Sequence, residues 1–357
     1  MDRTLSAPGK LFLSGEYAVL WGGVARILAV GPRVHALVRP RPDRQVDVVL
    51  ADGRLSGPAT PAGVRWEKEV PEAFRFVATT IDLSLRLLGT EGPGFSVAFE
   101  SSPTVDGLKL GLGSSARAVV LAAEAARYGL EAHYDTLKLS LLAHADAQGG
   151  KGSGGDVAAA FAGGVVRYRK YDAAKLLSAA SRGGLLVAME QSPSVDLARM
   201  GEPVFPMLFA FSGHSASTTA LVKEVERKFD EPTRRRFVER SDGLGETLET
   251  GLLRRDFKAV ELASEGLQSL LWELGVTRDE GLDRVLNLAR TFGCAGKQSG
   301  AGGGDGAVLF APDAEAQRTL LDALLARGIH AFAIQPDRGL QGEVARHPVL
   351  SAWLDAL

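Results

Sequence analysis

Glycine, and the way it is grouped, is the feature that most restricts how this chain can fold. The sequence has 42 glycines among 357 residues, about 12%, against about 7% in an average protein. Many of them gather in short clusters rather than in a low-complexity tract. A residue without Cβ lets the backbone turn tightly and lets a ligand come close to main-chain atoms. The clusters therefore predict loops that surround a large ligand.

The length and composition are those of a globular protein with two domains. A chain of 357 residues is long for one core, and 45% hydrophobic with 24% charged residues excludes a disordered or fibrous chain. Predicted helices and strands alternate irregularly, which favours the α+β class. A stretch rich in proline and glycine at 190–205 marks a boundary. We expect domains at 1–195 and 196–357.

Charge and cysteine content restrict the partners and the compartment. The chain has 41 Lys and Arg against 43 Asp and Glu, a balance that argues against a general nucleic-acid binder. Its one cysteine, Cys294, cannot form an internal disulfide, which indicates a reducing cytoplasm. No apolar stretch approaches the roughly 18–20 residues that span a bilayer, and Glu16 interrupts any signal-peptide core. We expect a cytoplasmic protein without membrane or nucleic-acid partners.

Hydrophobic periodicity predicts the remaining elements. The chain begins with extended segments, and a loop or hairpin region covers 40–65. Helices are predicted at 71–88, 114–128, 134–148, 217–274 and 315–325, and strands at 95–99, 185–189, 207–211, 307–310 and 330–334.

The strongest local signal is the turn that precedes the helix at 114–128. It consists of Gly111, Leu112, Gly113, Ser114, Ser115 and Ala116. The first turn of a helix has unpaired N–H groups and the positive end of the helix dipole, so a phosphate fits there. The serine hydroxyls add donors or bind Mg²⁺. The alternative is an ordinary helix start with tight-turn glycines.

The same turn also fits the dinucleotide pattern G-x-G-x-x-A, with Glu131 twenty residues after Gly111. That fingerprint requires a strand that runs straight into the first glycine. Here residues 103–107 separate the preceding strand from the turn, so this interpretation is not favoured. The P-loop pattern G-x-x-x-x-G-K-[ST] does not occur in the sequence.

Two more glycine clusters accompany this turn. Residues 297–305 lie between a predicted helix and an apolar strand and consist largely of glycine and alanine, which indicates a large ligand against their backbone. Residues 149–156 end in Asp156, which is either a helix cap or a carboxylate that orients or deprotonates a phosphoryl acceptor. Taken by itself, Lys10 in Ala7-Pro8-Gly9-Lys10 is an ordinary solvated lysine.

Taken in order, the segments 7–19, 111–116 and 299–305 resemble the three signature motifs of the GHMP kinases. The resemblance implies an N-terminal α/β domain of the ribosomal-protein-S5-like type with a left-handed crossover, and a ferredoxin-like C-terminal domain. ATP would bind between the two with Mg²⁺.

Further details resemble the phosphomevalonate kinase branch of that superfamily. These are Lys109 before the second motif, residues 143–159, and the serine-rich segment 211–218. Mevalonate kinases usually carry a glutamate where Ala145 stands, which favours an acceptor that already bears a phosphate. Arg117 is a second departure, because a small apolar residue is more usual there. The resemblance thus implies phosphoryl transfer to phosphomevalonate, a small-molecule acid on the mevalonate route to isoprenoids.

The resemblance also implies roles for individual residues. Lys10 and Lys109 would meet the acceptor and the γ-phosphate, and Asp156 would orient or deprotonate the acceptor. The turn at 111–116 would bind the ATP phosphates, with Ser115 reaching the metal. The acceptor would lie against Lys10, Glu16, Tyr17, Ser153, Ser215, Ser217, Ser299, Gly300, Ala301 and Gly302.

Several alternatives stay open. Within the superfamily they are a mevalonate kinase, a sugar kinase or another kinase with a different acceptor, and a diphosphomevalonate decarboxylase. A non-catalytic nucleotide sensor would not require Lys10, Lys109 and Asp156 together. From another class, residues 207–217 approach a G-x-S-x-G elbow with Ser215 as a hydrolase nucleophile, but the last position is Ser217 rather than glycine.

Overall fold

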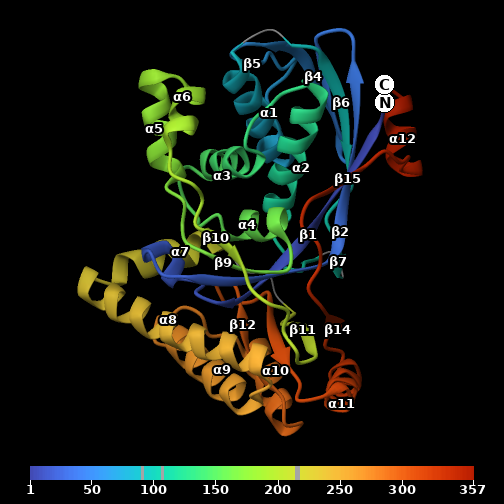
Figure 1. Cartoon of the computed structure of the whole chain (residues 1–357). Helices are drawn as coiled ribbons and strands as arrows, with labels where there is room; N and C mark the ends of the chain where they lie inside the picture. Colours follow the sequence, from blue (N-terminus) through green and yellow to red (C-terminus); the bar gives the residue numbers. More distant parts are fainter. Residues whose placement is uncertain (90–91, 106–107, 214–217) are drawn as a thin grey trace.

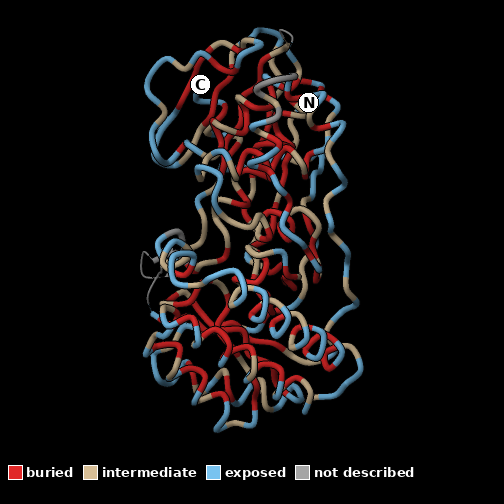
Figure 2. The backbone as a smooth tube through the Cα atoms, turned by 90° about the vertical axis from the view of Figure 1, so that its left-hand side faces the viewer, coloured by how far each residue is buried: buried red, intermediate tan, exposed pale blue. Residues whose placement is uncertain are grey.

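The computed structural model describes residues 1–89, 92–105, 108–213 and 218–357 and places them in two lobes, each built on its own sheet (Figure 1). Buried residues gather inside both lobes, and exposed residues follow the periphery (Figure 2). Each lobe therefore has its own hydrophobic core.

The sheet of the first lobe is organised around the long strand β2. One edge of β2 pairs with β1 along most of its length, while the other edge pairs first with β9 and further along with β6. The parallel neighbour of β6 is β3, and β4 and β5 extend the sheet. The bounds are β1 Arg3–Ser14, β2 Ala25–Arg41, β3 Gln45–Leu50, β4 Gly53–Thr60, β5 Gly63–Val64, β6 Gly94–Phe99, β9 Val165–Tyr168 and β10 Leu197–Arg199.

Helices pack on one another and on this sheet. The alanine-rich helix α2 contributes buried residues to two neighbouring clusters, with Val120 and Ala123 in one and Leu121 and Ala125 in the other. Small side chains on several faces let α2 lie close to both its helix neighbours and the strands. The bounds are α1 Arg75–Leu88, α2 Ser114–Gly129, α3 Thr136–Ala147, α4 Gly155–Ala162, α5 Ala173–Gly183 and α6 Leu185–Gln191, with short 3₁₀ turns at Ala18–Trp21 and Glu72–Phe74.

The second lobe has the ferredoxin-like arrangement that the family resemblance implies. Its antiparallel strands lie in the order β12-β13-β11-β14, and in the chain two helical segments separate them as β-α-β-β-α-β. The bounds are β11 Met207–Phe211, α7 Thr218–Lys228, α8 Glu231–Arg254, α9 Phe257–Trp272, α10 Glu280–Thr291, β12 Ala295–Ser299, β13 Gly306–Phe310, α11 Ala314–Leu325 and β14 Ala331–Ile334.

The chain returns to the first lobe at its C-terminus. Strand β15 (Gln341–Glu343) pairs with β1, and helix α12 (Pro348–Asp355) buries Leu350 and Leu354 beside Leu37 and Ala98 of the first sheet (Figure 1). The division at residue 195 stays a prediction, and the structure adds that the last segment of the chain covers the first lobe.

A buried ion pair joins the two lobes. Arg26 Nε of β2 donates to Glu249 Oε2 of α8 at 2.7 Å, and Arg167 Nε of β9 donates to Glu249 Oε1 at 2.9 Å. Burial raises the pKa of Glu249, but the hydrogen bonds from Arg167 and Arg26 outweigh it and hold the pKa below its ordinary value of 4.5. The carboxylate therefore stays charged between two guanidinium groups.

The strand predicted at 185–189 is wrong, because this segment forms helix α6. Leu185 and Met189, four residues apart, are both buried, whereas Leu186 and Val187 are each 46% exposed. That spacing is one face of a helix, and a short apolar run does not by itself distinguish a strand from a helix.

Candidate active site

A cavity of about 500 Å³ brings the three glycine clusters together with the N-terminal motif. The first lobe contributes Lys10, Phe12, Glu16, Tyr17, Leu20, Phe76, Gly111, Gly113, Ser114, Ser115, His144, Gln148, Gly152, Ser153 and Asp156, and the second lobe contributes Val222, Gly300, Ala301 and Asp305. Predicted residues more than 280 positions apart thus meet in one site.

Other predicted residues lie elsewhere. Leu112, Ala116, Ser299 and Gly302 are adjacent to the lining but are not part of it. Lys109 lies in the short strand β8 (Leu108–Lys109), paired with β7 (Thr104–Val105), but the described structure does not include its side chain. Ser215 and Ser217 lie outside the described residues.

Two helices begin at the cavity without a side-chain cap. The residues that precede α2 and α4 are Gly113 and Gly154, and neither offers a side chain to the first turn. By contrast, aspartate side chains cap α3, α5, α8, α9, α10 and α11. An aspartate cap would bring negative charge to the N–H groups that a phosphate needs. The uncapped start of α2 is therefore suited to an anion.

The backbone of the turn requires glycine at two positions. Gly111 has φ +69° and Gly113 has φ +81°, both in the left-handed region. A Cβ on Gly111 would lie 2.6 Å from Asp305 Cγ, and one on Gly113 would lie 3.2 Å from Lys10 Cγ and 3.7 Å from Asp156 Cβ. The turn is thus closely surrounded by three other segments of the site.

Lys10 supplies the positive charge at this turn. Its Nζ donates to Gly111 O at 2.8 Å and lies 5.6 Å from the ring centre of Phe12. Its backbone N donates to Leu112 O at 3.1 Å. Both contacts hold the strand β1 against the turn, so the ammonium group lies where the turn and the cavity meet.

His144 is a site residue that the sequence reasoning missed. Its Nε2 lies 3.1 Å from Ser115 Oγ, 3.8 Å from Asp156 Oδ2 and 3.2 Å from Gln148 Nε2. The ring is buried and the carboxylate of Asp156 is partly open to the cavity. A signal was present, because His144 and Gln148 are four residues apart on one face of α3, directly before a glycine cluster.

The predicted acceptor residues Glu16, Tyr17 and Ser299 hold the two lobes together. The buried Glu16 carboxylate pairs with Lys297, and Tyr17 OH donates to Ala301 O at 2.8 Å. Burial raises the pKa of Tyr17, and Glu16 raises it further, so the phenol keeps its proton. Ser299 Oγ accepts from the backbone N of Phe12 at 2.7 Å. These groups fix the loop at 300–305 against the first lobe.

Arg117 is buried directly behind the turn. It is 2% exposed, its Nη1 donates to Pro32 O at 3.1 Å, and its Nε has no hydrogen-bond partner in the part of the chain that the structure describes. Burial lowers the pKa of Arg117 to about 10. The protein therefore tolerates a poorly solvated cation in the first turns of α2.

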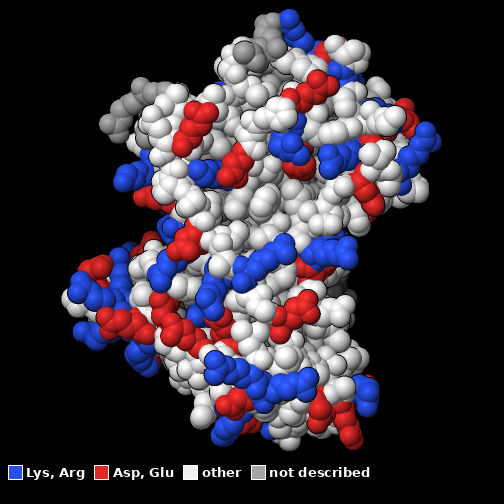
Figure 3. All heavy atoms as spheres, in the orientation of Figure 1, with Lys and Arg blue, Asp and Glu red and all other residues white. Residues whose placement is uncertain are grey.

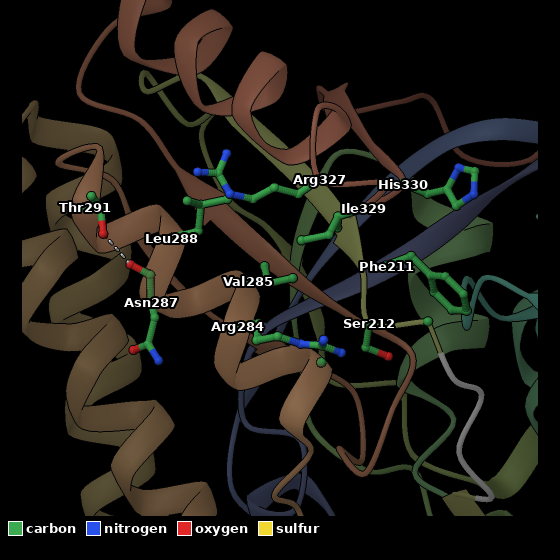
Figure 4. A pocket seen from close by; sticks show the side chains of 13 residues that line it. Phe211, Ser212, Arg284, Val285, Asn287, Leu288, Thr291, Arg327, Ile329 and His330 are labelled. Carbon is green, nitrogen blue, oxygen red and sulfur yellow. Dashed lines mark hydrogen bonds between the residues drawn. The ribbon is translucent and has the colours of Figure 1, made fainter.

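A second cavity, of about 600 Å³, lies in the second lobe beside the ends of β11 and α10 (Figure 4). Arg284, Arg327 and His330 line it, and its described lining contains no carboxylate. A Ser-His-Asp triad needs an acid that orients the histidine. Because Ser215 lies outside the described residues, the hydrolase alternative stays a prediction.

The charges on the molecular surface agree with the near-neutral composition. On the face drawn in Figure 3, acidic and basic side chains are interspersed over both lobes. Among the described residues, none of the helices combines the length and apolar character that crossing a bilayer requires.

Comparison with known proteins shows which family the chain resembles. Residues 75–164 match the model of the GHMP kinases N terminal domain. The chain is 32% identical over 344 residues to a phosphomevalonate kinase of Streptomyces sp. (strain CL190), covering 88% of this chain and 91% of that protein. It is 33% identical over 172 residues to a mevalonate kinase of Aeropyrum pernix, covering 46% of this chain and 50% of the relative.

A solved structure shows the same fold. It is that of Streptococcus pneumoniae phosphomevalonate kinase in complex with phosphomevalonate and AMPPNP, with a TM-score of 0.78 and 21% identity. The match covers 92% of this chain and 99% of that one. The predicted α+β class and the two-domain arrangement are confirmed.

Proposed function

The chain belongs to the GHMP kinase family, and from this premise we propose that it transfers the γ-phosphoryl group of ATP to the phosphate of phosphomevalonate. The relative with 32% identity over most of both chains is a phosphomevalonate kinase, which supports this acceptor. The solved structure with phosphomevalonate and AMPPNP supports a site that takes both molecules.

The observation that carries the proposal is the convergence of a cation, an uncapped helix start and a carboxylate on one cavity. The residues that line it include Lys10, Asp156 and, from the turn, Gly111, Gly113, Ser114 and Ser115. Phosphoryl transfer between two phosphate-bearing molecules brings many negative charges together, so it needs cations and amide donors aimed at one point. We assign the ATP phosphates to the turn and to the first N–H groups of α2.

In the proposed reaction an oxygen of the acceptor phosphate attacks the γ-phosphorus, and the bond from that phosphorus to the bridging β–γ oxygen breaks. The products are a diphosphate ester and ADP. The second pKa of a phosphate monoester is about 6, so the acceptor is already ionised near neutral pH. Asp156 therefore orients the acceptor more than it deprotonates it, and Lys10 stabilises the negative charge of the transferring group.

The site also has the oxygen ligands that Mg²⁺ prefers. The Ser115 hydroxyl and the Asp156 carboxylate both lie near His144 Nε2, at 3.1 Å and 3.8 Å. We propose that these two oxygens and the ATP phosphates hold the metal, which neutralises charge on the phosphate oxygens when bound. His144 then positions Ser115 and Asp156 relative to each other.

We also propose that the protein works in the reducing cytoplasm. Its one cysteine, Cys294, is buried, and burial raises the pKa of this thiol to about 11. A thiol that stays protonated is unreactive and needs no oxidising compartment.

The second candidate is a mevalonate kinase, favoured by the match to the Aeropyrum pernix protein over half its length. A mevalonate hydroxyl needs a stronger base than a phosphate does, because its proton must be removed during attack. Helix α3 presents His144 to the cavity, while Ala145, at the position of the usual glutamate, does not line it. This difference favours the phosphate acceptor.

The test is a coupled assay of ADP release with mevalonate, phosphomevalonate, diphosphomevalonate and homoserine, and mass spectrometry of each product. We expect kcat/KM for phosphomevalonate to exceed that for the other acceptors by about 100-fold or more, because a site built for a phosphate loses its pairing with an acceptor that lacks one. Lys10→Met should abolish most of the activity, and Lys10→Arg is the matched variant that keeps the charge. Faster turnover of mevalonate, or release of CO₂ from diphosphomevalonate, would contradict the proposal.

A further inference from the structure

Three potential metal ligands meet on the first lobe, away from the kinase cavity. His35 lies in β2, Glu100 directly follows β6, and His347 precedes helix α12. His35 Nδ1 lies 2.8 Å from Glu100 Oε2, and His347 Nε2 lies 3.0 Å from Glu100 Oε1. The two imidazole rings lie 5.3 Å apart between centres, and one ligand atom from each of the three residues lies within 4.8 Å of the others.

The chemistry of this group matches a transition metal rather than Mg²⁺. Two imidazole nitrogens and one carboxylate oxygen form a ligand set found in zinc sites, whereas Mg²⁺ and Ca²⁺ prefer oxygen alone. The side chains are 35%, 31% and 21% exposed in the order His35, Glu100 and His347, so an ion can enter and water can complete its coordination.

We propose that His35, Glu100 and His347 bind one divalent ion of the zinc class, and that this ion fastens the C-terminal segment to the first lobe. Two hydrogen bonds already hold His35 and Glu100 near their positions. The backbone N of His35 donates to Glu100 Oε2 at 2.9 Å, and the backbone N of Glu100 donates to His35 O at 2.9 Å.

The three ligand atoms must draw together to accept the ion. Ligand atoms around a tetrahedral zinc ion with bonds of roughly 2.0–2.1 Å lie about 3.3 Å apart. The three ligand atoms lie within 4.8 Å of one another, and the contacts at 2.8 Å and 3.0 Å reach different oxygens of Glu100, so the side chains must rotate until all three face one ion. Partly exposed side chains can make that adjustment without moving the sheet.

Metal binding would change a hydrogen-bond contact at the start of α12. The backbone N of Leu350 lies 3.4 Å from His347 Nδ1, which is a long contact. A neutral imidazole that binds a metal through Nε2 carries its proton on Nδ1, so this contact is exchanged for the coordination bond. The buried side chains of Leu350 and Leu354 keep α12 packed on the first lobe when that contact is lost, and the ion adds a second attachment between the C-terminal segment and this lobe.

The test uses the full-length chain after removal of any histidine tag, stripped with a chelator and dialysed. Titration calorimetry with Zn²⁺, together with metal analysis, should give one ion per chain. His35→Ala, His347→Ala and Glu100→Gln should each weaken binding by more than about 100-fold, beyond the 10–100-fold typical of residues that only support a ligand. His133→Ala, at an exposed histidine elsewhere on the lobe, is the matched control and should bind as the unchanged protein does.

Two further measurements separate coordination from a purely structural hydrogen-bond network. Zn²⁺ should raise the Tm of the unchanged protein and of His133→Ala but not that of His347→Ala. Co²⁺ should give the visible absorption of a tetrahedral nitrogen and oxygen site. Absence of stoichiometric binding, or His347→Ala binding as tightly as the unchanged chain, would overturn the proposal. Neither readout uses ATP, so failure here is distinct from failure of the kinase assignment.

Discussion

Replacing Gly111 with alanine tests whether the turn at 111–116 binds the nucleotide. Gly111 has φ +69°, and a side chain in this left-handed region costs about 1–2 kcal/mol. In addition, the new Cβ would lie 2.6 Å from Asp305 Cγ and 2.7 Å from Asp305 Cβ. Such a clash involves the first side-chain atom of Asp305, so either the turn or the loop at 300–305 must shift.

The chain offers a matched control in Gly89, the residue that ends α1. It has φ +63°, but a Cβ placed there meets nothing within 4 Å. Gly89→Ala should therefore lower the free energy of unfolding by about 1–2 kcal/mol and leave catalysis unchanged. Gly111→Ala should cost a further 1–3 kcal/mol or so, because overpacking adds to the backbone strain.

The effect on activity separates the two variants most clearly. A displaced turn loses backbone donors to the phosphates, and one such donor is worth roughly 2.7–4 kcal/mol in a transition state. We expect kcat/KM for ATP to fall about 100–1,000-fold in Gly111→Ala and less than about twofold in Gly89→Ala. Chemical unfolding and initial-rate kinetics at 25 °C measure both quantities. If Gly111→Ala has the kinetics of Gly89→Ala while both are folded, the turn does not bind the nucleotide.

Three other substitutions test separate parts of the structure. Asp156→Asn should keep at least about 1% of kcat with phosphomevalonate, because an ionised phosphate needs no strong base. The same change in a relative that phosphorylates a hydroxyl should lower kcat about 10²–10⁴-fold. Complete loss of activity with the phosphate acceptor would count against this role of Asp156. Arg117→Met should raise the free energy of unfolding at pH 7, because burial lowers the pKa of Arg117 to about 10 and the cost of burying the charge is fully present below that pH. Removing the charge gains up to about 3 kcal/mol, and the lost hydrogen bond takes back about 1 kcal/mol. An unchanged or lower free energy in urea unfolding would contradict this expectation. Glu249→Gln should destabilise the protein by about 3–5 kcal/mol at pH 7, because it leaves Arg26 buried without its partner. The pKa of Glu249 is lowered from 4.5, so its contribution is complete above pH 4.5 and is lost as the pH falls through the folded value. Unfolding curves of the two proteins should thus converge in acid, and a constant difference down to pH 3 would refute the charge-based explanation.

Much of the site could be predicted from local sequence. Two glycines directly before a helix start predict a phosphate-binding turn within six residues, and Gly111 and Gly113 can be recognised in the sequence without any knowledge of the fold. In the structure both glycines have positive φ and precede α2. The family resemblance implies the ferredoxin-like second lobe, and periodicity places the strands at 207–211, 307–310 and 330–334 where β11, β13 and β14 lie. Backbone conformation and helix ends depend mainly on neighbours in sequence, which is why these predictions agree with the structure.

The contacts between distant segments were decided only by the tertiary structure. The spacing of His144 and Gln148 marks a candidate site residue, but only the fold shows that His144 lies near Ser115 and Asp156. Likewise, nothing near Glu16 indicates a buried partner 281 residues away at Lys297. The helix at 185–191 and the return of α12 to the first lobe also depend on which surfaces pack together. Packing joins whole faces of helices and sheets that come from distant parts of the chain. A local pattern of residues therefore does not specify which segment of the other lobe it will contact.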